Sequence, residues 1–302
     1  MPEVVAVPPG WAVLAVLLVA LAGWWSASLD ARVSGGGWSA PVAEVARLLR
    51  QRRRTLLAAD RLLWRLGGGG LLVVALLMVA VVPLGRWTLA DLGVGVVWFN
   101  AMDVLVWALV WMAGWGPNSA HALVGGYRFL AQAMAYELPL MFALTAPAVA
   151  AGSLRLGDVV AAQQESWFVL RMPVAFAVFC TCVVAFSVRG PFAAAAGTDI
   201  AGGVLAEVSG VDRLLLLAGR HALLVAGSAF AVVAFLGGGA GPWLPGWVWT
   251  LVKTFALVSV LVVAGRRLPS LRPDRLVEVG WVVLLPLTLL QLLVVSVVVV
   301  VG

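Results

Sequence analysis

A carboxylate stands inside one of the most apolar stretches of this sequence. Glu137 lies within the run 129–152, which otherwise consists almost entirely of Ala, Leu, Met, Phe and Pro. A lone charged group at the centre of a bilayer costs roughly 2.5 kcal/mol or more, so such groups are usually functional or paired. Pro139 and Pro147 leave helix carbonyls unpaired nearby, which suits a polar or hydrated site. The alternative is a structural acid neutralised by protonation or by an arginine.

Other polar residues of the same region and of neighbouring apolar runs are further candidates. Gln132, five residues before Glu137, can share part of its helix face, whereas Arg128 is expected to face the cytoplasmic loops. Asp103 lies inside another apolar run, where we expect it to pair with Lys253 or Arg220, with a proton relay in place of a lost carboxylate as the alternative.

Two acids of a polar loop and one histidine allow two interpretations each. Asp199 and Glu207 fall in the loop before the run 214–236, where a solvated or docking charge and a role beside a ligand are equally consistent with the sequence. For His221, a hydrogen-bonded packing role is favoured over proton transfer.

The composition restricts the class of protein. The chain has 302 residues, of which 63% are hydrophobic and 11% charged, whereas soluble domains carry about 25% charged residues. The net charge of +6 comes from arginines beside apolar runs, which indicates membrane orientation and not nucleic-acid binding. Cys180 and Cys182 point to different sides of a helix, so they favour packing over a disulfide or a metal site.

Eight apolar runs are long enough to cross a bilayer, which takes about 20 residues each. The sequence therefore predicts an all-α polytopic membrane protein with a single membrane domain over residues 1–302. The expected spans are Trp11–Ser28, Gly69–Leu84, Val94–Trp115, Phe129–Gly152, Trp167–Val188, Leu214–Leu236, Trp247–Ala264 and Val279–Val301.

The arginines predict the orientation. Loops after the odd-numbered spans hold fifteen arginines, and the opposite loops hold Arg86 and Arg155. The arginine-rich side is predicted to be cytoplasmic, with both termini outside. Residues 41–66 combine apolar positions at helical spacing with Arg52, Arg53 and Arg54. They predict a basic amphipathic helix on the membrane surface or under a partner, with topogenic charge alone as the alternative.

Seven motifs in order, from Gly114 onward, resemble those of the H subunit of bacterial NADH:quinone oxidoreductase. This subunit is subunit 1 of complex I, and its family includes the membrane subunit of energy-converting hydrogenases. The motifs are Gly114-Trp115-Gly116-Pro117-Asn118-Ser119, Arg128 to Gln132 with Tyr136-Glu137-Leu138-Pro139, Asp158-Val159-Val160 with Gln163, Arg189-Gly190-Pro191-Phe192, Glu207-Val208-Ser209-Gly210, Phe235 to Gly238 with Gly241-Pro242, and Leu268-Pro269 through Arg275-Leu276 with Gly280-Trp281 and Pro286. The first 110 residues match in layout only.

The resemblance implies a bundle of about eight helices that forms part of a quinone chamber and couples quinone chemistry to proton movement through buried acids. The implied partners are other membrane-arm and peripheral-arm subunits, quinone and membrane lipid, in a bacterial plasma membrane. Quinone is a substrate of the whole assembly, and this chain is expected to hold no cofactor and to catalyse nothing alone. The candidate quinone-cavity or coupling residues are Arg128, Gln132, Tyr136, Glu137, Asp199 and Glu207.

The sequence departs from the family where the family carries acids. Phe186, Ala193 and Gly219 stand at such positions, and the chamber-lining motif after the first span is not visible. A Phe in place of an acid removes a titratable group and dries the path, so we expect weak or absent proton conduction along the usual route. The alternative function is a scaffold subunit of a partial or hydrogenase-like complex without quinone binding.

Overall fold

The computed structural model describes residues 4–198 and 201–301. Within these ranges, eight helical segments are long and apolar enough to cross a membrane, so the chain is an all-α multi-pass membrane protein. The main helices are α1 (Ala12–Val33), α3 (Arg61–Ala80), α4 (Gly95–Trp115), α5 (Ala120–Ala151), α8 (Pro173–Phe186), α9 (Gly210–Phe235), α10 (Gly246–Arg267) and α12 (Leu285–Val301).

Shorter elements connect these helices. They are β1 (Val5–Ala6), η1 (Pro9–Trp11), α2 (Ala40–Arg50), β2 (Trp87–Thr88), α6 (Leu156–Ala161), α7 (Phe168–Arg171), η2 (Gly190–Ala196), α11 (Pro273–Val279) and the π-helical turn η3 (Gly280–Leu284). β1 pairs with β2 in parallel, which ties the chain before α1 to the loop after α3.

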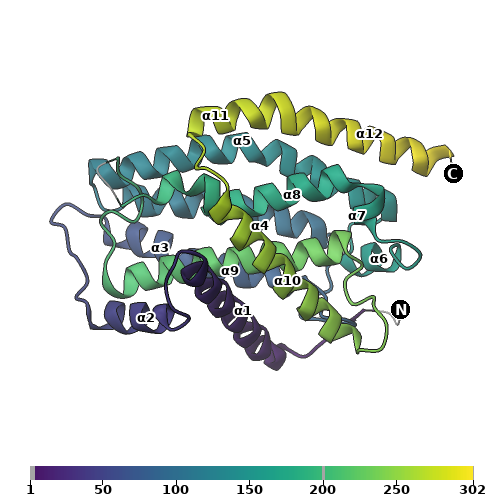
Figure 1. Cartoon of the computed structure of the whole chain (residues 1–302), viewed down its shortest axis with the longest axis horizontal. Helices are drawn as coiled ribbons and strands as arrows, with labels where there is room; N and C mark the ends of the chain where they lie inside the picture. Colours follow the sequence, from purple (N-terminus) through teal and green to yellow (C-terminus); the bar gives the residue numbers. More distant parts are fainter. Residues whose placement is uncertain (1–3, 199–200, 302) are drawn as a thin grey trace.

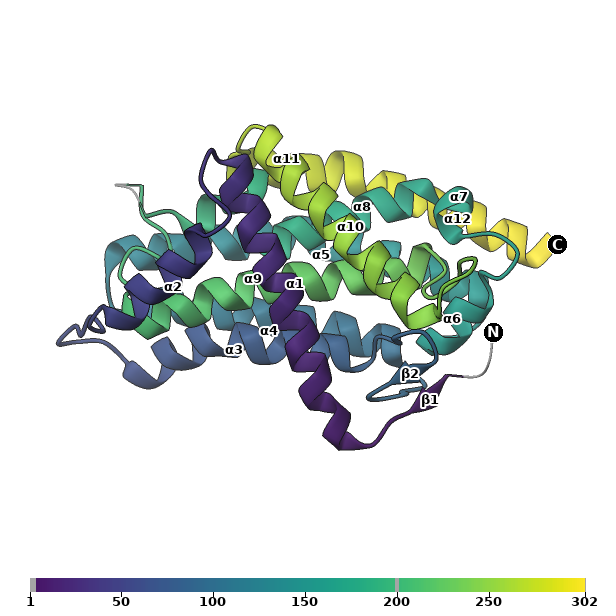
Figure 2. The ribbon, with the colours of Figure 1, turned by 60° about the horizontal axis from the view of Figure 1, so that its bottom comes forward.

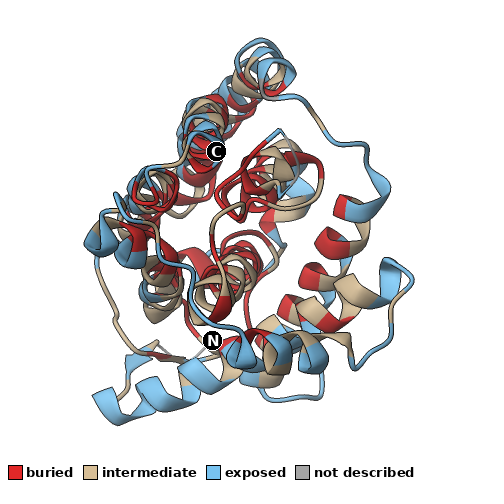
Figure 3. Ribbon diagram, turned by 90° about the vertical axis from the view of Figure 1, so that its left-hand side faces the viewer, coloured by how far each residue is buried: buried red, intermediate tan, exposed pale blue. Residues whose placement is uncertain are grey.

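Helix α9 lies at the centre of the bundle and contacts α1, α3, α8 and α10 (Figure 1). α1 crosses the bundle obliquely (Figure 2), and α12 lies along the outer side of α5. Viewed from the end, the buried residues gather on the helix faces that point inward (Figure 3). Phe99 of α4, Phe179 of α8 and Phe230 of α9 pack in this core, with the rings of Phe99 and Phe230 4.0 Å apart. Rigid aromatic packing of this kind holds α4 and α9 at a fixed separation.

Glycines allow the helices around the site to approach closely. A Cβ atom added to Gly114 of α4 would lie 2.8 Å from the Ala122 carbonyl oxygen of α5. A side chain there would push α5 away from α4, so the small residue sets the spacing between these two helices.

Several helix boundaries differ from the sequence-based expectation. The predicted helix 41–66 is wrong as one element: α2 ends at Arg50, and residues 61–66 belong to α3. The Asp60 carboxylate caps α3 by accepting hydrogen bonds from the backbone N–H groups of Leu62 and Leu63, at 3.0 and 3.1 Å. α5 also begins earlier than predicted and includes Arg128.

The fifth and eighth spans are interrupted. The fifth is divided between α7 and α8 at Met172, which precedes Pro173, because a residue before proline is disfavoured in the helical conformation. The eighth passes through η3, where Gly280 lies against α5. Both segments remain membrane-crossing by length, as expected.

The arginine-rich loops meet at one end of the bundle. Arg54 of the α2–α3 loop and Ser119 before α5 both bind Glu207, and the Leu271 N–H donates to the Pro191 carbonyl. This common location agrees with the odd-even alternation of the loops. That this end is cytoplasmic, with the N-terminus outside, stays a prediction.

Candidate functional site

Two carboxyl groups lie next to each other inside the bundle. Asp103 of α4 is fully buried, and it interacts electrostatically with Glu137 of the adjacent helix α5. Neither carboxylate oxygen of Asp103 has a well-formed hydrogen bond within the described part of the chain, and the same holds for Oε2 of Glu137. Buried polar atoms are normally satisfied by protein or by ordered water. Carboxyl oxygens in this arrangement can bind water or share a proton.

Three further polar side chains complete this polar cluster, which comprises Asn100, Asp103, Trp107, Tyr136 and Glu137. Asn100, Asp103 and Trp107 are three and four residues apart, which places them on one face of α4. Oδ1 of Asn100, Nε1 of Trp107 and the Tyr136 hydroxyl are buried and make no well-formed hydrogen bond among the described residues, although these side chains lie close enough to interact with Glu137 and with one another. A cluster of donors and acceptors in this state can order a short chain of water molecules.

Proline shapes the helix beside the polar cluster. Pro139 has no N–H group, so the carbonyl of Ala135, four residues earlier, loses its usual helical partner. Gly280 of η3 lies against this carbonyl, and a Cβ added there would come within 2.3 Å of its oxygen. Glycine at position 280 therefore permits the last span to cover the opened turn of α5.

The other two candidates on α5, Gln132 and Arg128, bind backbone carbonyls of other segments. The Gln132 side-chain amide donates to the Ala185 carbonyl at 2.7 Å, which joins α5 to α8. Arg128 Nη1 donates to the Gly202 carbonyl at 2.8 Å, in the loop before α9. The expectation that Arg128 faces the loops of the arginine-rich side is confirmed.

Glu207 is fixed at the arginine-rich end and is not part of the polar cluster. It accepts a 2.8 Å hydrogen bond from the Ser119 hydroxyl and a 2.6 Å hydrogen bond from Arg54 Nη1. The Ser119 hydrogen bond first, and then Arg54, hold the pKa of Glu207 below its ordinary value. Asp199, the other loop candidate, lies outside the described residues.

The predicted pairing of Asp103 with Lys253 or Arg220 is wrong. Lys253 Nζ donates to the carbonyls of Leu236, Gly238 and Ala240 at 2.7, 3.1 and 2.7 Å, and it lies 4.1 Å from the centre of the Trp167 ring. These contacts close the end of α9. Arg220 donates to the backbone carbonyls of Ser187 and Val188. Both cations therefore bind carbonyl groups away from Asp103, and Asp103 has an acid as its neighbour.

A second charged group brings together residues that are far apart in the sequence. Arg266 donates to both carboxylate oxygens of Asp30, at 2.5 and 2.7 Å, and Arg189 lies 3.5 Å from the same carboxylate. Arg189 also donates to Nε2 of His221 at 2.9 Å, and Nδ1 of that ring is 2.9 Å from the Ser26 hydroxyl. Because a guanidinium can only donate, Nε2 accepts and the Nδ1 proton points to Ser26. The hydrogen-bonded role expected for His221 is confirmed.

Sequence reasoning did not single out Asp30 or Ser26. The signal for Asp30 was available, because it is the one acid at the end of the first span, next to a loop rich in arginine. Its partners Arg189 and Arg266 are more than 150 residues away, so no local spacing could identify them.

A cavity of about 470 Å³ lies at the arginine-rich end, between α1, α2, α3 and α9. We call it the α1–α2 cavity. Its walls are apolar except for a few side chains that include Asp30, Glu44 and His221. An apolar space with a few convergent polar groups is typical of a small-molecule site.

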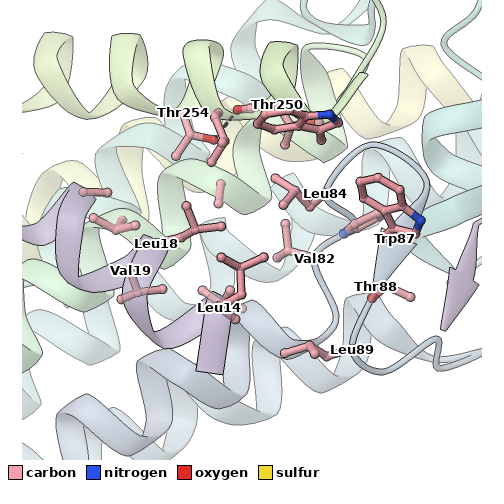
Figure 4. A pocket seen from close by; sticks show the side chains of 18 of the residues that line it. Leu14, Leu18, Val19, Val82, Leu84, Trp87, Thr88, Leu89, Thr250 and Thr254 are labelled. Atoms are coloured by element: carbon pink, nitrogen blue, oxygen red, sulfur yellow. Dashed lines mark hydrogen bonds between the residues drawn. The ribbon is translucent and has the colours of Figure 1, made fainter. Parts of the chain in front are cut away.

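A second cavity of about 480 Å³, here the α1–α10 cavity, lies between α1, the end of α3, the β2 loop and α10 (Figure 4). Leu14, Leu18 and Leu84 point into it, and Trp87 lies at its side. Thr250 and Thr254 donate their hydroxyl protons to carbonyls of their own helix. The walls therefore offer hydrocarbon contacts and little polar recognition.

Comparisons with known proteins place the chain in a family. The family model for NADH dehydrogenase matches residues 10–296. The NADH-quinone oxidoreductase H subunit 1 of Geobacter metallireducens is 35% identical over 87% of this chain and 83% of the relative. The H subunit of Geobacillus kaustophilus is 35% identical over 85% and 79%, and the H subunit 2 of Cereibacter sphaeroides is 37% identical over 87% and 84%. The match covers nearly the whole bundle, and the chain therefore belongs to the family of NADH-quinone oxidoreductase H subunits, which are membrane subunits of complex I.

Proposed function

We propose that this chain forms the membrane wall of the quinone site in a complex I-like NADH:quinone oxidoreductase of a bacterial plasma membrane. The main support for this proposal is the α1–α2 cavity. Three of the four helices that line it, α1, α3 and α9, are long enough to cross the membrane, so an apolar molecule would enter it from lipid, and it extends to the polar side chains of Asp30 and His221. Apolar walls suit the isoprenoid tail and the flat ring faces of a quinone.

Electron transfer would take place in partner subunits and not in this chain. Both cysteines are free, and Cys182 is buried in the core, so we assign them packing roles and expect this chain to hold no redox cofactor. The peripheral arm would supply electrons, and this chain would position the quinone that receives them. Contacts among the loops at the arginine-rich end, such as Arg54–Glu207, would shape the surface on which those partners dock.

The polar cluster is the proposed proton-binding element of the chain. Asp103 stands next to Glu137, and the surrounding buried donors and acceptors can order water. Two neighbouring carboxyl groups in an apolar setting hold at least one proton between them, because both cannot be charged together at low cost. We therefore propose Asp103 as a partner of Glu137 in coupling.

Conduction beyond this cluster along the usual route would be weak. Phe186 is fully buried, and its ring lies 6.5 Å from Tyr136 and 6.4 Å from Phe99. At Gly219, an added Cβ would lie 2.6 Å from the Leu71 Cβ, so an acid there would not fit between α9 and α3. These positions present hydrocarbon where a relay would require titratable groups.

Substitution in the wall of the α1–α2 cavity tests the quinone proposal. Ala27→Trp would fill the cavity from α1, whereas Leu21→Trp, on the exposed side of the same helix, serves as the matched control. In the assembled complex, Ala27→Trp should raise the KM for quinone or abolish quinone reduction. NADH oxidation by an artificial electron acceptor should remain unchanged. Equal kinetics for both variants would instead favour the scaffold function without a quinone site.

A further inference from the structure

A third cavity, of about 270 Å³, lies where α1, α9, α10 and the start of η2 meet. We call it the arginine pocket, because Arg189, Arg220 and Arg266 all line it. Among the described residues, Asp30 is the one acid in this lining. Three guanidinium groups thus face a single carboxylate, which leaves an excess of positive charge around the space.

The three arginines retain hydrogen-bond donors that the described part of the protein does not use. Arg189 Nε is buried and has no partner among the described residues. Arg220 uses Nε and one Nη atom on backbone carbonyls, and Arg266 uses Nε and one Nη atom on Asp30. A guanidinium carries five N–H donors in a planar fork that matches the oxygens of phosphate. Donors from three separate segments therefore surround one space.

The backbone holds these donors in place. Gly190 follows Arg189 with a φ of +54°, and a Cβ there would lie 2.6 Å from the Cα of Gly265, which precedes Arg266. The close approach of these two glycines keeps η2 against the end of α10. Arg189 and Arg266, each next to one of these glycines, are consequently held where both reach the Asp30 carboxylate.

The cavity becomes apolar toward the middle of the spans. Leu224 lies one helical turn from Arg220 on α9, and Leu261 lies just over one turn before Arg266 on α10, and both line the cavity. Ser270 and Arg266, which are exposed, line the cavity at the arginine-rich end of the bundle. The cavity is therefore positively charged at its exposed end and apolar at its inner end. This arrangement fits an amphiphile whose anionic head lies at the membrane surface.

We infer that the arginine pocket binds the phosphate group of an anionic phospholipid, with the first part of an acyl chain against Leu224 and Leu261. Basic pockets between spanning helices recognise lipid headgroups in this way, and charge-assisted bonds from guanidinium to phosphate are among the strong hydrogen bonds of proteins. Inorganic phosphate shares this chemistry, but it has no apolar part to contact Leu224 and Leu261 at the inner end of the cavity. The inference does not depend on quinone binding.

Lipid retention by variants tests the inference. The full chain is placed in nanodiscs of phosphatidylcholine with or without phosphatidylglycerol, and lipids that survive extraction are counted by native mass spectrometry. Arg220→Gln and Arg266→Gln should each reduce retention of phosphatidylglycerol by roughly tenfold. Arg267→Gln is the matched control, because this exposed neighbour does not line the cavity. Using two variants guards against misfolding, since Arg266 is half exposed.

Arginine modification by phenylglyoxal identifies the source of the phosphate. Phosphatidylglycerol should protect Arg189, Arg220 and Arg266 from the reagent, and inorganic phosphate in phosphatidylcholine nanodiscs should protect them much less. Protection by inorganic phosphate alone would overturn the lipid assignment. Equal lipid retention by all three variants, or no protection by either compound, would overturn the phosphate site itself.

Discussion

Asp103 of α4 and Glu137 of α5 lie side by side within the bundle, and neither finds a basic partner among the described residues. The two candidates for such a partner, Lys253 and Arg220, are occupied by backbone carbonyls elsewhere. An acid pair inside apolar surroundings is costly unless it carries protons. This relationship makes the pair the most specific chemical feature of the membrane core.

Removing the two carboxyl groups separately and together should reveal their coupling. Asp103→Asn and Glu137→Gln should have non-additive effects on unfolding free energy, with an interaction energy of about 0.5–3 kcal/mol. Each single substitution relieves the contact between the acids, so the second then gains little. Thermal melts of the two single variants and the double variant measure the cycle. Glu165→Gln, at an exposed position, is the control and should combine additively with Asp103→Asn, whereas additivity within the acid pair itself would contradict the coupling.

The loop before α9 should loosen at low pH. The pKa of Glu207 is lowered from its ordinary value of 4.5 by Ser119 and Arg54. A lowered folded-state pKa means that the stabilisation is fully present above the unfolded-state pKa and is lost as pH falls through the folded-state pKa. Amide exchange of residues 201–209 should therefore be faster in Glu207→Gln than in the natural chain at neutral pH. The two rates should converge in acid, and a difference that persists or widens in acid would contradict this role.

Lys253 should act through stability. Lys253→Met would leave the carbonyls of Leu236, Gly238 and Ala240 without their donor, which costs about 1–3 kcal/mol for a buried group left unpaired. The melting temperature should fall, and Lys253→Arg should restore part of it. Proton pumping normalised to folded protein should be unchanged. A selective loss of pumping at an unaltered melting temperature would instead show a functional role.

The contact between α3 and α9 should reject even a methyl group. Gly219→Ala would place a Cβ 2.6 Å from the Leu71 Cβ and should destabilise the protein by about 1–3 kcal/mol. Gly69→Ala is a matched change in α3, because its added Cβ would have its nearest neighbour at 3.9 Å. Thermal unfolding compares the two variants. If Gly219→Ala were as stable as Gly69→Ala, close packing would not explain why an acid is missing at this position.

The sequence was sufficient to predict the spans because each one is a continuous apolar run, and hydrocarbon thickness sets its length. It was insufficient for the helix ends, since these depend on caps such as Asp60 and on tertiary contacts such as Gly280 with Ala135. Glu137 could be predicted as an unusual residue from its surroundings alone. Its pairing with Asp103 and the Asp30–Arg189–Arg266 contact could not, because the packing of helices decides which distant side chains meet.

The most direct test of the quinone-wall proposal is to map a photoreactive quinone bound to the assembled complex. After irradiation in native membranes, peptide mass spectrometry should find the label on α1 and α9 around the α1–α2 cavity, near Gly23, Ala27 and Leu217. An excess of unlabelled quinone should prevent the labelling, and Ala27→Trp should reduce it while Leu21→Trp leaves it intact. Specific labelling confined to other subunits, with none on this chain, would contradict the proposal.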